Sequence, residues 1–286
     1  MKKPQFFLAL TGIILVFFVY YFGQFKSTIK QAPVTQGPMM SGGEMPPPTI
    51  TIDTLLTLAK SNLSSAQINK LAELEKKTKS ASNKDAQLAA FHQLTHFWKD
   101  SARIFEPYAW YEGEAARLEN SEKSLTFAAR LFLDDLQNDG DQERRRWKAL
   151  QAKDLFERSL TINPANDSAK VGLGACYLFG NISTSPMEGI TKIREVTQKD
   201  SNNVYAQMML IKGSLLSGQY EKGIERLNRI YQVDPKNIEA ILLMAELYER
   251  TGDKKSAISW YEKSLSFAPN KEIKSAITQR IEELKK

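Results

Sequence analysis

The chain has 286 residues, of which 42% are hydrophobic and 25% are charged, a composition typical of a folded chain with a core. Disorder throughout the chain is therefore excluded. The formal net charge is +6, but the 39 basic and 33 acidic residues are interspersed, and this excludes a basic block of the kind that binds nucleic acid. Cys176 is the only cysteine, so an intrachain disulfide is also excluded.

The N-terminus contains an uncharged apolar segment, residues 6–22. A helix of this length covers about 26 Å at about 1.5 Å per residue, close to the hydrocarbon thickness of a bilayer. The segment ends in Tyr20, Tyr21 and Phe22, which suit an interfacial aromatic belt better than a signal peptidase site. We therefore expect a transmembrane anchor over residues 1–25, with a cleaved signal peptide as the alternative.

Residues 26–50 contain five prolines and a Gly-Gly pair, which predict a flexible linker. Lysines flank the apolar segment on both sides, so charge alone says little about orientation. A four-residue tail with two lysines favours the inside. This predicts a single-pass protein of the inner membrane, with the following domain in the periplasm of a Gram-negative cell.

The rest of the chain has an internal period of 34 residues, seen most clearly in segments 204–237 and 238–271. Gly218 superposes on Gly252, where each chain segment turns. Pro235 superposes on Pro269, which would end the second helix. Ala245 is a small residue where two helices could approach closely. These two segments resemble tetratricopeptide repeats.

Further repeats of the same kind are expected upstream, and a polar-backed capping helix is expected at the C-terminus. The predicted divisions are N-terminal helices at 51–87, repeats at 88–121, 122–166, 167–203, 204–237 and 238–271, and a cap at 272–286. The repeat at 122–166 carries extra residues around 137–146, which predict a longer corner between its helices. The expected fold is all-α, a right-handed α-solenoid of tetratricopeptide type behind an N-terminal transmembrane helix.

In tetratricopeptide proteins the first helix of each repeat lines a groove that holds a peptide or a helix of a partner. The resemblance implies that the groove residues here are Val171, Ala175, Leu178, Tyr205, Met208, Met209, Lys212, Glu239, Leu242, Glu246 and Glu249. Most are aliphatic or acidic, unlike the lysine, asparagine and arginine that grip a C-terminal carboxylate in chaperone-type repeats. A partner segment that is apolar and flanked by basic residues would suit such a groove. The alternative is that Met208 and Met209 only pack against the neighbouring repeat.

The predicted function is a membrane-anchored scaffold that binds another protein through this groove. The alternative is a periplasmic assembly chaperone that holds unfolded clients, similar to the anchored tetratricopeptide proteins of cytochrome c maturation. We expect no enzymatic activity, no cofactor, no nucleic acid and no small-molecule substrate.

Three features could suggest chemistry. His92 and His96 have the spacing of a zinc-binding pair, but the sequence has no third histidine. Cys176 lies in a glycine-rich apolar stretch that predicts a packing helix, so we expect it in the core. Residues 144–148 are mainly basic and could contact phosphate or anionic lipid, but the adjoining Asp141 and Glu143 favour a solvated face.

Overall fold

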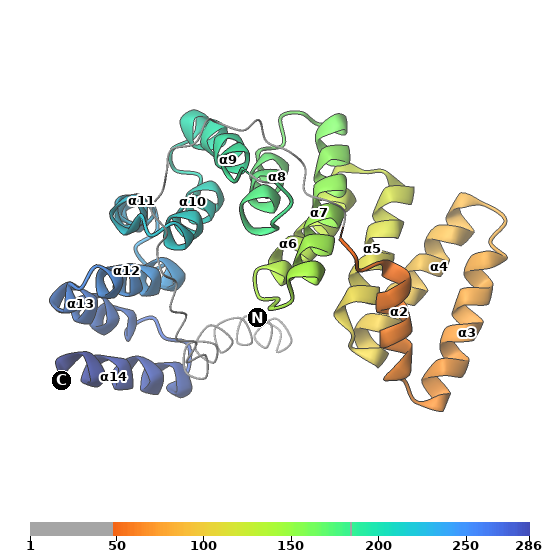
Figure 1. The fold of residues 1–286 in the computed structure, drawn as a ribbon, viewed down its shortest axis with the longest axis horizontal. Helices are drawn as coiled ribbons and strands as arrows, with labels where there is room; N and C mark the ends of the chain where they lie inside the picture. Colours follow the sequence, from red (N-terminus) through yellow and green to blue (C-terminus); the bar gives the residue numbers. More distant parts are fainter. Residues whose placement is uncertain (1–47, 184) are drawn as a thin grey trace. The chain divides into compact units, whose positions relative to one another are not determined.

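The computed structural model describes residues 48–183 and 185–286. All of the described residues belong to one compact unit. Within it the chain forms helices and no β-strand, which confirms the expected all-helical architecture (Figure 1). In chain order the helices are α2 (Ile52–Ser61), α3 (Ser65–Lys79), α4 (Lys84–His96), η1 (Phe97–Ala102), α5 (Phe105–Glu119), α6 (Glu122–Leu136), α7 (Gln142–Ile162), α8 (Asp167–Phe179), α9 (Met187–Lys199), α10 (Val204–Leu216), α11 (Tyr220–Val233), α12 (Ile238–Arg250), α13 (Lys254–Ser264) and α14 (Lys271–Lys285).

Asparagine side chains begin the first helices of three successive hairpins and the C-terminal helix. The side chains of Asn166, Asn203, Asn237 and Asn270 each accept a hydrogen bond from the backbone N–H three residues later, at the starts of α8, α10, α12 and α14. Each cap satisfies a backbone donor that the first turn leaves without a partner. Gly218 and Gly252 follow α10 and α12 with φ of 69° and 83°, a conformation that glycine adopts without strain.

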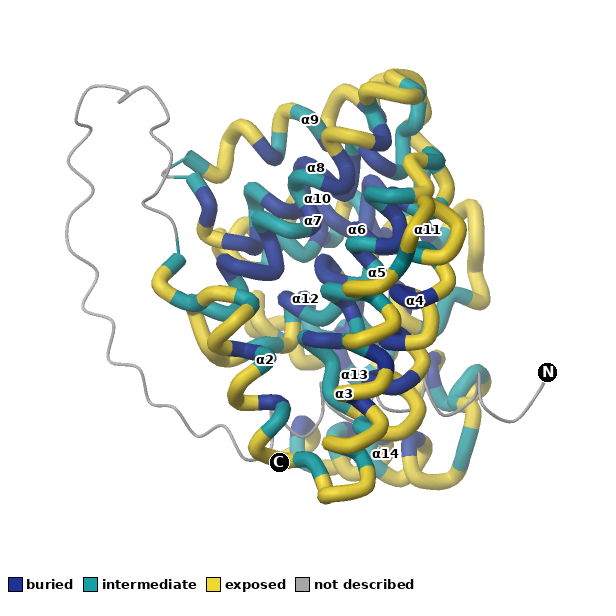
Figure 2. The backbone as a smooth tube through the Cα atoms, turned by 90° about the vertical axis from the view of Figure 1, so that its right-hand side faces the viewer, coloured by how far each residue is buried: buried dark blue, intermediate teal, exposed yellow. Residues whose placement is uncertain are grey.

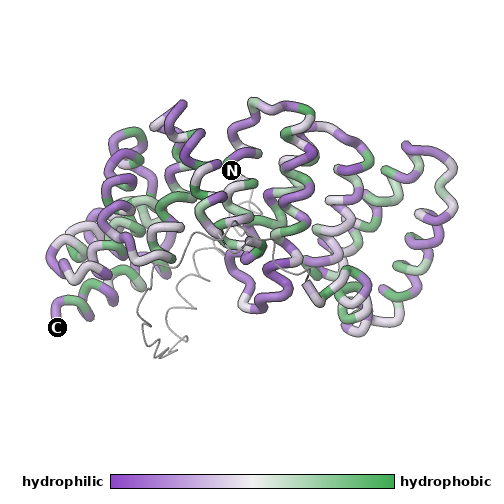
Figure 3. The backbone as a smooth tube through the Cα atoms, turned by 45° about the horizontal axis from the view of Figure 1, so that its top comes forward, coloured by the Kyte–Doolittle hydropathy of each residue, from purple (hydrophilic) through white to green (hydrophobic). Residues whose placement is uncertain are grey.

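Neighbouring helices pack in pairs, α6 with α7, α8 with α9, α10 with α11 and α12 with α13. The first helices of three successive pairs, α6, α8 and α10, also pack directly side by side, whereas α10 and α12 are joined chiefly through α11. Buried residues lie along the surfaces that face neighbouring helices, and exposed residues lie on the opposite surfaces (Figure 2). Hydrophobic and hydrophilic stretches alternate along the helices in the same manner (Figure 3). This amphipathic pattern buries each helix against its neighbours.

Helices α8 and α9 approach each other through glycine. A Cβ atom on Gly174 would lie 2.6 Å from Ile193 Cγ1 and 2.7 Å from the backbone oxygen of Gly189. No real Cβ tolerates such distances, so the two helices can sit this close only because Gly174 has no side chain.

Helix α2 does not follow the pairing of the other helices. It packs on α5, where Leu55 joins the core cluster of α5 to α10, while Ala59 joins the cluster around Trp98. The residues before α2 also contact α7, because the Thr49 amide and hydroxyl both donate to Glu143 Oε2, at 2.7 and 3.0 Å. Residues 48–61 therefore lie against α5 and α7, which are the second helices of their hairpins.

Two local features differ from the sequence-based expectation. The corner between α6 and α7 spans only residues 137–141, and the extra residues instead lengthen α7 to 21 residues. The side chain of Asp141 caps α7 through the Arg144 amide, so the helix begins within the predicted insertion. Helix α4 continues into the π-helical turn η1, which ends at Arg103 in the left-handed conformation (φ 56°).

The predicted localisation is contradicted. No helix among the described residues is long and apolar enough to cross a membrane. The longest of them, α7, has 21 residues, but its sequence begins QERRR, and charged groups of this kind are costly in hydrocarbon. A single-pass inner-membrane protein with a periplasmic repeat domain is therefore not supported. The predicted anchor at residues 6–22 lies outside the described residues, as does most of the linker.

Candidate functional site

Helix α8 does not present the groove residues predicted on it. Val171 and Ala175 are fully buried in the core cluster, and only Leu178 is half-buried. The physical reason is that α6 and α10 pack on α8 from either side and cover its small side chains. A partner could reach Val171 and Ala175 only by separating these helices.

The methionines predicted for the groove are also core residues. Met208 is 6% exposed and packs in the cluster of α10 to α12, whereas Met209 is 5% exposed and packs in the cluster that contains α8. Both methionines therefore pack against neighbouring helices, as the alternative interpretation of the sequence proposed. A charged substitution at Met208 would test folding before it tested binding.

The acidic residues predicted on α12 are mostly paired within the chain. Glu246 Oε1 accepts hydrogen bonds from Arg250, at 2.7 and 2.9 Å. Glu249 is held by Arg280 and by the Tyr261 hydroxyl. Glu239 is more accessible, because its side chain is 61% exposed and its ion pair with Lys212 Nζ is long, at 3.8 Å. Leu242 is half-buried beside it on α12.

The structure brings together α6 and α10, a pairing that the sequence did not indicate. Lys212 Nζ on α10 lies 3.3 Å from the Oε1 atom of Gln137, the residue that follows α6, across 75 positions of the chain. The Arg130 guanidinium lies 4.9 Å from the centroid of the Tyr205 ring. Sequence reasoning identified Tyr205 and Lys212 but none of the α6 residues. The available signal was the run Phe127, Arg130 and Asp134, which helical spacing places on one face of α6.

We name this surface the α6–α10 face and define it by Phe127, Arg130 and Asp134 of α6 and by Tyr205 and Lys212 of α10. Phe127 is 52% exposed, which is uncommon for so large an apolar side chain in a packed array. Burial raises the pKa of Asp134, although Arg130 and Lys212 act in the opposite direction. Burial likewise raises the pKa of Tyr205, whose hydroxyl has no hydrogen-bond partner among the described residues. The face thus combines an exposed ring with incompletely paired polar groups.

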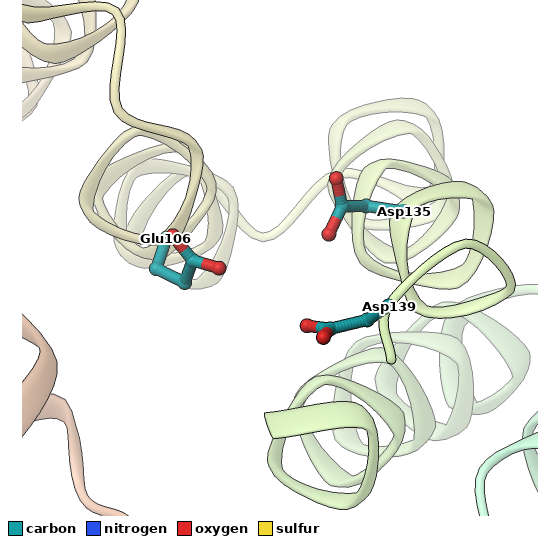
Figure 4. Close-up of side chains that lie close together, drawn as sticks. All are labelled: Glu106, Asp135 and Asp139. Carbon is teal, nitrogen blue, oxygen red and sulfur yellow. The ribbon is translucent and has the colours of Figure 1, made fainter. Parts of the chain in front are cut away.

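A second group of polar residues lies between α5, α6 and α7. Glu106 faces Asp135 and Asp139, and carboxylate oxygens of the three lie within 4.8 Å of one another (Figure 4). The space that a cation would need holds the Lys148 ammonium, which is 2.7 Å from Asp139 and 3.0 Å from Glu106 and also contacts Asp135. We therefore interpret this group as a structural ion cluster.

The ion cluster corrects the expectation that residues 144–148 form a solvated face. The Lys148 side chain is only 2% exposed, and Arg144 Nη2 lies 2.7 Å from Asp139. Burial opposes the charge on Lys148, but hydrogen bonds to Asp135 and Asp139 outweigh it and hold the pKa of Lys148 above its ordinary value. Burial also opposes the charge on Asp139, yet hydrogen bonds from Arg144 and Lys148 hold its pKa well below the ordinary range. Burial raises the pKa of Asp135 despite its bond to Lys148.

The remaining chemical candidates lie apart from both groups. His92 and His96 are exposed on α4, and His96 Nδ1 lies 3.1 Å from Asp100 Oδ2. Neither histidine belongs to a potential metal-ligand cluster within the described part of the chain. Cys176 is fully buried in α8, and burial raises the pKa of its thiol, which disfavours the reactive thiolate.

Residues 214–279, from the end of α10 into α14, match the family description "Tetratricopeptide repeat". Tetratricopeptide repeat sequence is thus identified in this segment of the chain. Its array is similar to a tetratricopeptide repeat protein from Parabacteroides merdae, at 13% identity and a TM-score of 0.53, over 82% of this chain and 86% of that one. At this identity the similarity shows the fold alone.

Two further solved structures resemble the tetratricopeptide array more distantly. MamA from Desulfovibrio magneticus is 18% identical with a TM-score of 0.43, over 66% of this chain and 97% of that one. YrrB, described as a tetratricopeptide protein with an unusual peptide-binding site, is 13% identical with a TM-score of 0.42, over 73% and 97%. No curated protein sequence matches the chain.

Proposed function

We propose that this chain is a protein-binding scaffold that holds a peptide segment of its partner on the α6–α10 face. The observation that carries the proposal is the exposed Phe127 beside the stacked Arg130 and Tyr205, on the first helices of two hairpins. Exposed aromatic and arginine side chains are the types enriched where proteins bind one another. In tetratricopeptide proteins the first helices line the peptide groove, so the position of the face agrees with the family.

The proposed site differs from the groove that the sequence suggested. Four of the groove residues suggested by the sequence are buried in the core: Val171, Ala175, Met208 and Met209. Tyr205 and Lys212 remain, and Phe127, Arg130 and Asp134 of α6 replace the buried positions. Glu239 and Leu242 extend the accessible surface from Lys212 onto α12.

Site-specific photo-crosslinking tests the scaffold proposal. A benzophenone amino acid replaces Phe127 in the full chain, in the cells that produce it, and the attached peptides are identified by mass spectrometry. The matched control carries the same group at Val233 on α11, because the two positions are almost equally exposed, at 52% and 50%. We expect one protein to be attached through a short segment at position 127 and not at position 233. No attachment at 127, or the same products at both positions, would contradict the proposal.

A further inference from the structure

We propose that the α6–α10 face selects a peptide segment in which an acidic side chain lies next to an apolar one. The carboxylate binds Arg130 and the apolar side chain packs on Phe127. This inference rests on the proposed function and specifies the chemistry of the partner.

The Arg130 guanidinium has open donors. Arg130 is exposed, and it donates no hydrogen bond and forms no ion pair with any described residue. Asp134 lies four residues later, where an ion pair along the helix is expected. Lys153 and Glu157 have the same spacing and the same order of charges, and they pair at 3.1 Å. Unlike Lys153, Arg130 places its guanidinium over an aromatic ring, that of Tyr205, 4.9 Å from its centroid.

Stacking on an aromatic face leaves the edge of the planar group, with its N–H donors, free for a ligand. A carboxylate matches this edge with two parallel hydrogen bonds. Lys212 adds a second positive charge to the face, and its ion pair with the exposed Glu239 is long, at 3.8 Å. Asp134 is the only carboxylate among the five residues that define the face, so Arg130 and Lys212 give the face a net positive charge.

Phe127 lies three residues before Arg130, so the two side chains stand about 4.5 Å apart along the helix axis and on the same side. Adjacent side chains of a partner segment can therefore reach both. An acidic residue alone would leave the exposed Phe127 ring in water, and an apolar residue alone would leave the Arg130 donors unused.

Three bead-bound pools of short peptides test the inference against the purified full chain. The pools have the same random flanks and differ only at the centre, which is Leu-Asp, Leu-Asn or Leu-Lys. Because hydrogen bonds to charged groups are stronger than neutral ones, we expect about tenfold more labelled protein on the Leu-Asp pool than on the others. Arg130→Glu is expected to reverse the preference toward Leu-Lys. Arg229→Glu, on α11, is the matched charge reversal and is expected to leave the preference unchanged.

Two changes at Tyr205 separate stacking from folding. Tyr205→Phe keeps the ring and is expected to retain the Leu-Asp preference. Tyr205→Leu removes the ring, so that Arg130 can pair with Asp134, and is expected to lose the preference while helicity measured by circular dichroism is unchanged.

The outcomes distinguish this inference from the proposed function. If all three pools bind equally and Phe127→Ser abolishes binding, the scaffold proposal stands and the acidic preference is refuted. A Leu-Asp preference that survives in Arg130→Glu also refutes it, because the carboxylate would then bind elsewhere. If no pool binds and position 127 gives no cross-link, both proposals fail.

Discussion

The hairpins α6–α7 and α12–α13 both have buried apolar residues between their helices, but of the two only α6–α7 also contains a buried ion cluster. Between α6 and α7 a lysine with a 2% exposed side chain is surrounded by Glu106, Asp135 and Asp139. Between α12 and α13 the contacts are small and apolar, with Ala245 and Ala257 fully buried. The regular 34-residue spacing belongs to the apolar hairpin, and the lengthened helix belongs to the charged one. A repeat can therefore accept an insertion when its extra turns find charged partners outside the hairpin, as Lys148 finds Glu106 of α5.

The largest effect is expected from a charge placed in the apolar hairpin. Ala245→Glu puts a carboxylate at a position with no exposure, where a close helix contact leaves it no partner. We expect α12 to α14 to unfold, with a cost of about 4 kcal/mol or more. Hydrogen exchange would show the loss in these helices, while the core cluster of α5 to α8 stays protected. Protected amides in α12 would contradict the packing described here.

Removal of the Lys148 charge from the α6–α7 hairpin is expected to have the next largest effect on stability. Lys148→Ala leaves three carboxylates facing one another in a partly buried site, at a cost of about 3–5 kcal/mol. The midpoint of denaturant unfolding measures this loss. Lys153→Ala on the same helix is the control, because its pair with the exposed Glu157 contributes at most about 1 kcal/mol. Equal losses in the two variants would mean that the ion cluster has no special role.

A third comparison concerns the glycine contact between α8 and α9. Gly174→Ala places a Cβ 2.7 Å from the backbone of Gly189, which can move less easily than a side chain. We expect a loss of about 1–3 kcal/mol in the free energy of unfolding, read from thermal denaturation. Gly140→Ala is the control, since a Cβ there meets no atom within 4 Å. A stability gain at Gly174 would show that the helices can separate at low cost.

The smallest effect is the pH dependence of the ion cluster. Asp139 has a pKa held below its ordinary value, so its contribution to stability is complete above the unfolded pKa of about 3.9 and is lost as the pH falls below it. Asp135 has a raised pKa, so its effect on stability has the opposite pH dependence. Protonation of this carboxylate removes the cost of burying its charge. We expect the stability difference between wild type and Asp139→Asn to shrink between pH 5 and pH 3. A difference that is constant over this range would argue against a depressed pKa for Asp139.

The helices and their ends were determined largely by the sequence itself. Asn237 caps the start of α12, and Gly252 has a positive φ in the turn after it. Each of these signals depends only on residues that are close in the sequence. The 34-residue period likewise identified the repeat type, because it repeats these local signals. The length of α7 was harder to predict, since the corner residues that precede it resemble a loop.

Only the tertiary structure decided which residues of the repeats can meet a partner. Ala175 lies on the first helix of its repeat, where the family places groove residues, yet α6 and α10 cover it. Arg130 and Tyr205 carry no sequence signal that links them, because 74 residues separate the members of this stacked pair. Local spacing determines which face of a helix is apolar, but the approach of helices two hairpins apart depends on how closely small residues such as Gly174 allow each pair to pack.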